Sequence, residues 1–359
     1  MKSVEHWSSV SAQITNRFIR KQKAPTFIRL TALACLWLGL AACTQKPWLH
    51  STLEDYQSRL ANILEIEPPS LITPNIISTT PKQVFSPQGS AEPLNIKLRE
   101  FYNLPECGIK PIIAERNTTL GKLQAPSQRY LYEVRLLAAL YRCMMMVDDE
   151  PQQEQRSIIN RKEQVVVQSW HNLLYNSDEI NSARFSSSTH FDEQEDHRSA
   201  IQNWQSLLRF SPEELKGKRF QLSDANSLET LLQSISKFKT PAKLRNDMRL
   251  LISTLPQITI YLETNMTQLN CLTNPGDKIK AEYLRNVFNL FFIQEIQPQA
   301  GKINDWYFQL SVTFEELGFT EHEDNTLNKS LHNDFVSSIK DHVAQWQVFF
   351  ERCDIVPRN

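Results

Sequence analysis

The sequence predicts an all-α protein, built as a multi-helix bundle or stacked helical array, and three observations support this. Glycine is scarce, at 8 of 359 residues, whereas sandwiches and barrels need many glycine-bearing turns. Apolar residues recur at steps of three and four along most of the chain, which is the period of an amphipathic helix. Several of these runs begin at a capping residue or a proline, as helices do.

The first 42 residues predict a lipoprotein signal peptide. A basic N-terminal region precedes Leu30–Ala42, an uncharged run shorter than the ~20 residues that span a membrane. Leu40-Ala41-Ala42-Cys43 then matches a lipobox, which predicts cleavage before Cys43 and acylation of Cys43, palmitate included. The alternative is a short anchor helix. Thr44 rather than aspartate follows the cysteine, so we expect attachment to the periplasmic face of the outer membrane.

Charge limits the partners of the mature chain. Residues 1–42 hold six of the 39 basic and one of the 40 acidic residues, which leaves a net charge of about −6. No basic stripe interleaved with aromatic residues occurs, so no nucleic-acid partner is expected. The expected partners are the membrane, through the N-terminal lipid, and an envelope protein or peptidoglycan. No cofactor and no metal is expected.

The four cysteines that follow Cys43 predict disulfides, because an even number in an exported protein indicates pairing. They are Cys107, Cys143, Cys271 and Cys353. Three pairings are open, and we favour Cys107–Cys143 with Cys271–Cys353, since each closes one half of the chain. Free buried thiols are the alternative, and zinc is disfavoured because no Cys-x-x-Cys pair occurs.

The sequence predicts a short tether over residues 43–51 and a helical body over 52–359, with 52–175 and 199–359 as candidate subdomains. The elements of the first half come first. The expected elements are a helix over Thr52–Ile66, an extended proline-rich strap over Pro68–Pro93, a short helix over Ile96–Tyr102, a helix capped by Ser127 that continues to Val147, a helix over Gln153–Tyr175, and an exposed or mobile loop over Asn176–Arg198.

In the second half, helix signals repeat along the chain. The expected helices run through Leu228–Phe238, from Thr240-Pro241 to Leu255 with a kink or break at Pro256, from Asn274-Pro275 to Phe291, from Asp305 to Leu317, and from Thr326 to Arg352.

A polar motif between Cys107 and Cys143 supplies the candidate ligand-binding residues. Arg116 and Lys122 would bind an anion, with Asn117 as an orienting donor, and Glu115 and Glu133 flank them. The alternative, which we favour, is a structured connection in which Asn and Thr satisfy backbone groups.

The order of residues in this region resembles that of a known protein family. Cys107, Arg116-Asn117, Leu120-Gly121, Pro126-Ser127-Gln128, Tyr132-Glu133 and Cys143 occur in an order that resembles a family of gammaproteobacterial lipoproteins of unknown function. The resemblance implies an exported lipoprotein and no particular activity.

Two other groups of polar residues give weaker indications of a metal or catalytic site. His190, His197 and the acidic residues between them form a candidate metal set, but a solvated acidic loop is the favoured interpretation. His322-Glu323 is not followed by the second histidine of a metalloprotease. The sequence therefore predicts no catalytic residue and favours a binding or scaffolding module. The alternatives are an envelope hydrolase using Glu115, Arg116 and Asn117, and a carrier with an apolar cavity between its helices.

Overall fold

All regular structure described in the chain is helical, which confirms the predicted fold class. A computed structural model describes residues 48–74, 108–116, 118, 123–145, 153–191, 196–215, 222–319 and 327–356. These residues lie in one compact unit, Pro47–Asn359. Of the helices in these ranges, none combines the length and the apolar character needed to cross a bilayer.

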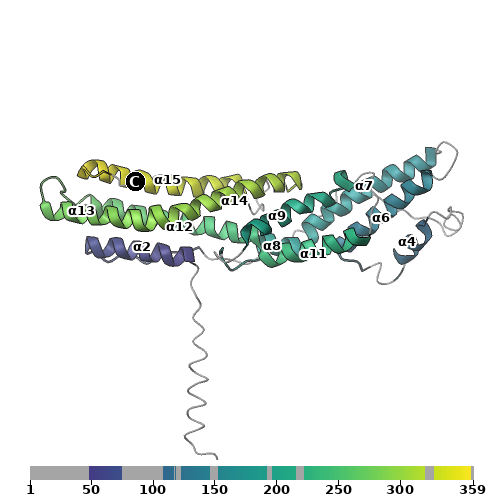
Figure 1. Cartoon of the computed structure of the whole chain (residues 1–359), viewed down its shortest axis with the longest axis horizontal. Helices are drawn as coiled ribbons and strands as arrows, with labels where there is room; N and C mark the ends of the chain where they lie inside the picture. Colours follow the sequence, from purple (N-terminus) through teal and green to yellow (C-terminus); the bar gives the residue numbers. More distant parts are fainter. Residues whose placement is uncertain are drawn as a thin grey trace, which may run out of the picture. The chain divides into compact units, whose positions relative to one another are not determined.

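The elements follow one another in a simple order (Figure 1). They are α2 (Trp48–Leu64), α4 (Ile109–Arg116), α6 (Pro126–Met145), α7 (Gln153–Asn176), α8 (Asp178–Phe185), α9 (His197–Leu207), η1 (Leu208–Phe210), α10 (Pro212–Leu215), α11 (Leu222–Phe238), α12 (Thr240–Met266), α13 (Pro275–Val287), η2 (Phe288–Ile296), α14 (Gln297–Glu316) and α15 (Lys329–Cys353).

Helix α12 is the centre of the packing. It contacts α2, α8, α9, α14 and α15, and Figure 1 shows α2 and α15 beside it. One hydrophobic core extends from Leu49 on α2 to Ile355 after α15. This core includes residues of both predicted subdomains, 52–175 and 199–359. A second, smaller cluster joins α4 to α6.

The chain from Pro275 to Glu316 is one continuous helical run, although the sequence predicts two helices there. The start at Asn274-Pro275 is confirmed, because the Asn274 side chain accepts from the Gly276 N–H. The run continues because η2 is a π-helix, in which the Gln297 N–H donates to the Phe292 carbonyl five residues back. Pro298, which has no N–H, follows where the bonds return to the α pattern.

The first part of the predicted strap is extended as expected. Between Glu67 and Pro74 no helix forms. The side chain of Gln257 on α12 binds this segment through a pair of hydrogen bonds to the backbone of Ile72. The Ile72 N–H donates to Gln257 Oε1, and Gln257 Nε2 donates to the Ile72 carbonyl, both at 2.9 Å. Residues 75–93 and the predicted helix at 96–102 lie outside the described residues.

Helix boundaries depart from the prediction at several points. Helix α2 begins at Trp48, so the last four residues of the predicted tether are helical. Ser127 is the second residue of α6 rather than its cap, because Pro126 opens that helix. Thr240 is likewise the first residue of α12, after Lys239 in a left-handed conformation. Helix α12 also continues through Pro256 to Met266 without a break.

The prediction of an exposed loop over residues 176–198 is wrong for most of that segment. Helix α8 forms within it, with the Ser177 hydroxyl accepting from the Ile180 N–H. Residues 185–191, which we call the collar, then lie against α12, and Ser187, His190 and Phe191 are buried. Residues 192–195 are not described.

Three consecutive side chains of α12 hold the collar. Arg245 Nη2 donates to the Phe185 carbonyl at 3.1 Å. Asn246 Nδ2 donates to the carbonyls of Ser187 and Thr189. Asp247 accepts from His190 and from the Phe191 N–H. Because successive helical residues point about 100° apart, these bonds leave α12 in different directions around its axis.

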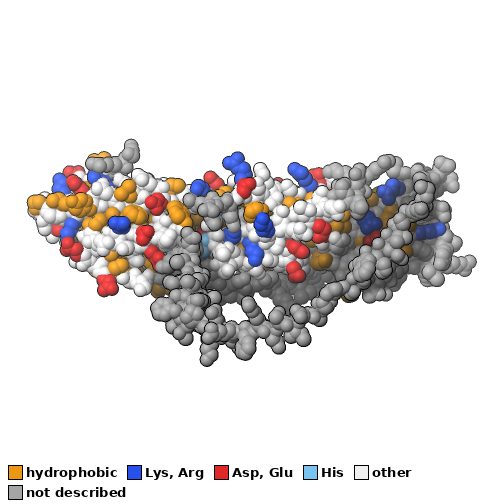
Figure 2. Space-filling view, turned by 60° about the horizontal axis from the view of Figure 1, so that its bottom comes forward, with side chains coloured by type: hydrophobic (Ala, Val, Ile, Leu, Met, Phe, Trp, Pro, Cys, Tyr) orange, Lys and Arg blue, Asp and Glu red, His pale blue; other side chains and the backbone are white. Residues whose placement is uncertain are grey.

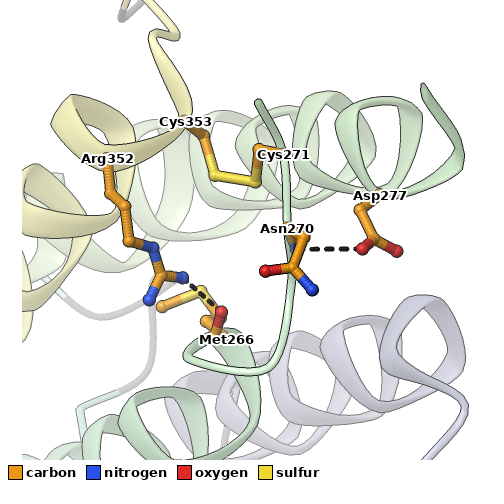
Figure 3. Close-up of a disulfide and its surroundings, with 6 residues drawn as sticks. All are labelled: Met266, Asn270, Cys271, Asp277, Arg352 and Cys353. Atoms are coloured by element: carbon orange, nitrogen blue, oxygen red, sulfur yellow. Dashed lines mark hydrogen bonds between the residues drawn. A yellow bond between two sulfur atoms is a disulfide. The ribbon is translucent and has the colours of Figure 1, made fainter. Parts of the chain in front are cut away.

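One of the two favoured disulfides is confirmed. Cys353, the last residue of α15, is bonded to Cys271 in the turn between α12 and α13 (Figure 3). Hydrogen bonds of the adjacent residues hold the two cysteines in place. Arg352, before Cys353, donates to the Met266 carbonyl, and the N–H of Asn270, before Cys271, donates to Asp277. The other predicted pair includes Cys107, which lies outside the described residues.

Candidate functional site

Of the predicted ligand-binding residues, the structure describes Glu115, Arg116 and Glu133. Glu115 is exposed and pairs with Arg135 at 3.2 Å. Glu133 lies two residues before Arg135 on α6, so its side chain points to the opposite side of that helix. Arg116 ends α4 and is half-buried, while Asn117 and Lys122 lie outside the described residues.

Glu133 belongs to a buried ion-pair cluster between α6 and α7. It is fully buried, and its two oxygens lie 2.6 Å from Lys162 Nζ and 2.5 Å from Arg129 Nη2. Since burying a lone carboxylate costs several kcal/mol, these two cations explain how Glu133 remains inside. Each carboxylate thus has its own cations, Arg135 for Glu115 and Lys162 with Arg129 for Glu133.

The residues of the candidate metal set also have other roles. His190 pairs with Asp247, and the ring of His197 packs 4.7 Å from that of Trp306. Asp196 caps α9 by accepting from the Ser199 N–H. Within the described ranges, no group of three or more His, Cys, Asp or Glu side chains could hold a metal ion.

A pocket of about 580 Å³ opens where α14 ends and α15 begins. Sequence reasoning places Tyr307 and Phe314 on one apolar helix face and does not find the pocket. Its lining combines aromatic and aliphatic side chains with a few polar groups: Tyr307, Phe308, Ser311, Val312, Phe314, Glu315, Gly318, Phe319, Leu327, Lys329, His332 and Asn333.

The inner wall of this pocket is held in place. Gly318 has a φ of +83°, a conformation that glycine adopts at least cost. The Tyr175 hydroxyl donates to the Gly318 carbonyl at 2.7 Å. The guanidinium of Arg184 lies 4.0 Å from the centre of the Phe319 ring on the buried side. A wall held by these two contacts is preorganised, which lowers the ordering cost of binding.

His332 is the polar centre of the pocket. Its ring stacks on Tyr307, with centroids 3.9 Å apart and planes within 6°. Its Nε2 lies 2.8 Å from Asn304 Oδ1. Because an amide oxygen only accepts, Nε2 carries the proton. Burial lowers the pKa of His332, so at neutral pH the ring is uncharged and Nδ1 has a free lone pair.

Among the described residues of the lining, the charged side chains are one acid and one base. Glu315 on α14 and Lys329 on α15 line the pocket with opposite charges, and the polar groups of Ser311 and Asn333 complete its edge. A largely apolar cavity of this size with a few convergent polar groups is typical of small-molecule sites. The arrangement can hold an apolar body against α14 and orient one polar end.

A protein-family model described as "Protein of unknown function (DUF3080)" matches residues 53–357. No curated protein and no solved structure matches the chain. The match includes every residue of the pocket and of the collar.

Proposed function

Because the chain belongs to the DUF3080 family, whose function is unknown, we propose its role from the site itself: it is a lipid-anchored binding module of the cell envelope. The observation that carries the proposal is the pocket beside His332, with its apolar lining and its preorganised wall. Of the two binding roles the sequence allows, this pocket favours a carrier or receptor of a small apolar ligand.

The proposed address rests on the lipobox. Acylation of Cys43 would tether the module to the periplasmic face of the outer membrane. Four residues separate Cys43 from Trp48, the start of α2. A chain of that length reaches at most about 18 Å, so the helical body would lie close to the bilayer.

The anchor is tested by labelling cells with an alkyne analogue of palmitate. Wild-type protein and a Cys35→Ser control should be labelled and should sediment with outer membranes. Cys43→Ser should lose the label and keep residues 1–42, which the mass of the protein reports. Label retained in Cys43→Ser would contradict the proposal.

Ligand binding is tested with Nile red, an uncharged apolar dye whose fluorescence rises in an apolar site. Val312 lines the pocket and Val348 on α15 does not, and the two are 55% and 59% exposed. Val312→Trp fills the pocket and should reduce dye binding at least tenfold, whereas Val348→Trp should leave it unchanged. Equal binding by both variants would contradict the proposed site.

A scaffolding role has separate support from an exposed apolar row. Leu272, Ile279, Tyr283 and Leu290 are each more than half exposed. Figure 2 shows hydrophobic side chains gathered at the end of the molecule where α13 lies. Apolar clusters of this kind mark interaction surfaces. Ile279→Lys with Tyr283→Lys should abolish cross-linking to an envelope partner while dye binding persists.

The second disulfide, Cys107–Cys143, forms part of the proposal. Cys143 is buried and packs in one cluster with Ile109 and Ile112 of α4. Ile109 follows Cys107 by two residues, so the packing of α4 on α6 would bring the two cysteines near each other. Peptide mapping without reduction should recover a cross-linked peptide containing both residues.

A further inference from the structure

The pocket can recognise more than apolar character, because His332 presents a defined acceptor. Asn304 fixes the proton on Nε2, and the stack on Tyr307 fixes the plane of the ring. The remaining nitrogen, Nδ1, makes no hydrogen bond among the residues described. A neutral imidazole in this form accepts a proton-bearing group and repels a lone pair.

The charged residues in the pocket lining bear on which charge a ligand can carry. Glu315 comes from α14 and Lys329 from the first turn of α15. A ligand carboxylate would meet the lone pair of Nδ1 and the Glu315 carboxylate, with one lysine as the opposing attraction. An ammonium group would meet Lys329. Within the described part of the lining, this pair of opposite charges therefore favours a ligand without net charge.

The apolar part of the ligand is defined by the wall of α14. Tyr307, Phe308 and Val312 come from that helix, and Phe319, which follows α14, also lines the pocket. A volume of about 580 Å³ lies within the range of roughly 300–1,000 Å³ that holds small ligands. The pocket thus has space for one apolar body and one polar end.

We propose that the site takes an uncharged amphiphile whose hydroxyl or amide N–H donates a hydrogen bond to Nδ1 of His332, while its apolar body packs against α14. The proposal rests on the proposed binding function and names the class of ligand. The chain or ring of such a molecule gives affinity, and the donor gives specificity, because an analogue without a donor displaces water from Nδ1 and makes no hydrogen bond in its place.

The test compares three probes of equal chain length, 1-dodecanol, dodecyl methyl ether and dodecanoate, by displacement of Nile red from the purified mature protein. In the wild type, the alcohol should bind about fivefold more tightly than the ether, as expected for one neutral hydrogen bond. Dodecanoate should bind more weakly than the alcohol.

Two variants at His332 assign that preference to the ring nitrogen. His332→Phe keeps a ring on Tyr307 but removes the acceptor, so the alcohol and the ether should bind equally. His332→Asn supplies an amide oxygen near the position of Nδ1 and should retain much of the preference. His50→Phe, which alters a histidine on α2 outside the pocket, should leave the ratio at its wild-type value.

The outcomes separate this inference from the function on which it rests. Equal affinity for the alcohol and the ether in the wild type, or tighter binding of dodecanoate, would overturn the donor requirement and leave the pocket standing. Failure of all three probes to displace the dye would count against the pocket itself. A preference that persists in folded His332→Phe would place the selecting group elsewhere.

Discussion

His190 and Asp247 form a buried pair, in which Nδ1 of the histidine lies 2.5 Å from Oδ1 of the aspartate although 57 residues separate them in sequence. The second oxygen of Asp247 accepts from the Phe191 N–H. A single carboxyl group on α12 thus satisfies both a side chain and the backbone of the collar.

Removing this carboxyl group should be strongly destabilising. We expect Asp247→Ala to lower the free energy of unfolding by about 3 kcal/mol, because two buried donors lose their acceptor. Urea denaturation measures the change. The matched control is Asp341→Ala, since Asp341 is exposed and accepts only from Ser337. A loss equal to that of the control would contradict the structural role of Asp247.

Stability should fall in acid because of His342. Burial lowers its pKa to about 3, and it lies in a network in which Thr259 Oγ1 is 2.8 Å from Nδ1 and the Tyr56 hydroxyl is 3.0 Å from Nε2. Below pH ~6.5 the unfolded chain takes up a proton that the folded chain refuses until about pH 3.

The stabilisation from neutral His342 is therefore present above pH ~6.5 and declines at up to about 1.4 kcal/mol per pH unit toward pH 3. His342→Gln should be less stable at pH 7 and have a flatter profile between pH 4 and pH 6.5. Urea unfolding at several pH values measures both profiles, and their difference isolates this group. Parallel profiles would contradict the assignment.

The cluster at Glu133 should behave as structural. Lys162→Met alone leaves the buried Glu133 carboxylate without one of its cations, and we expect a loss of about 3 kcal/mol. Adding Glu133→Leu removes the second charge and should restore most of the stability. Denaturation of the single and double variants completes the cycle. If the two losses simply add, the pair is not coupled.

The confirmed disulfide should stabilise the C-terminal half. It joins residues 82 positions apart, for which loop closure gives about 4.5 kcal/mol on the entropic account. Cys271→Ser with Cys353→Ser should lower the unfolding midpoint, and reductant should then have a smaller further effect than on the wild type. An unchanged midpoint would show that packing alone holds the end of α15.

The helices were predictable where the apolar period is long and the start signal is local. The cap at Asn274-Pro275 forms as expected, and the helix predicted from Thr326 to Arg352 forms as α15, Lys329–Cys353. The run from Pro275 to Glu316 was not predicted as one helix, because the π turns that accommodate Pro298 have no sequence signal of their own.

The collar shows a second reason why a prediction from the sequence failed. Its composition is polar, which normally indicates solvent exposure. The residues that satisfy it, Arg245, Asn246 and Asp247, come more than 50 positions later, and a single sequence does not show that pairing. The pocket has the same difficulty, since Tyr307 and His332 meet only after α14 and α15 pack.

The collar also determines how this protein can be divided. A cut between residues 176 and 198 would separate the collar from α7 or from α12, and either fragment would expose backbone groups that are now paired inside. The two halves of the sequence are thus not interchangeable modules. They are joined through the collar. An insertion, a circular permutation or a protease site placed in the collar should therefore unfold both halves together.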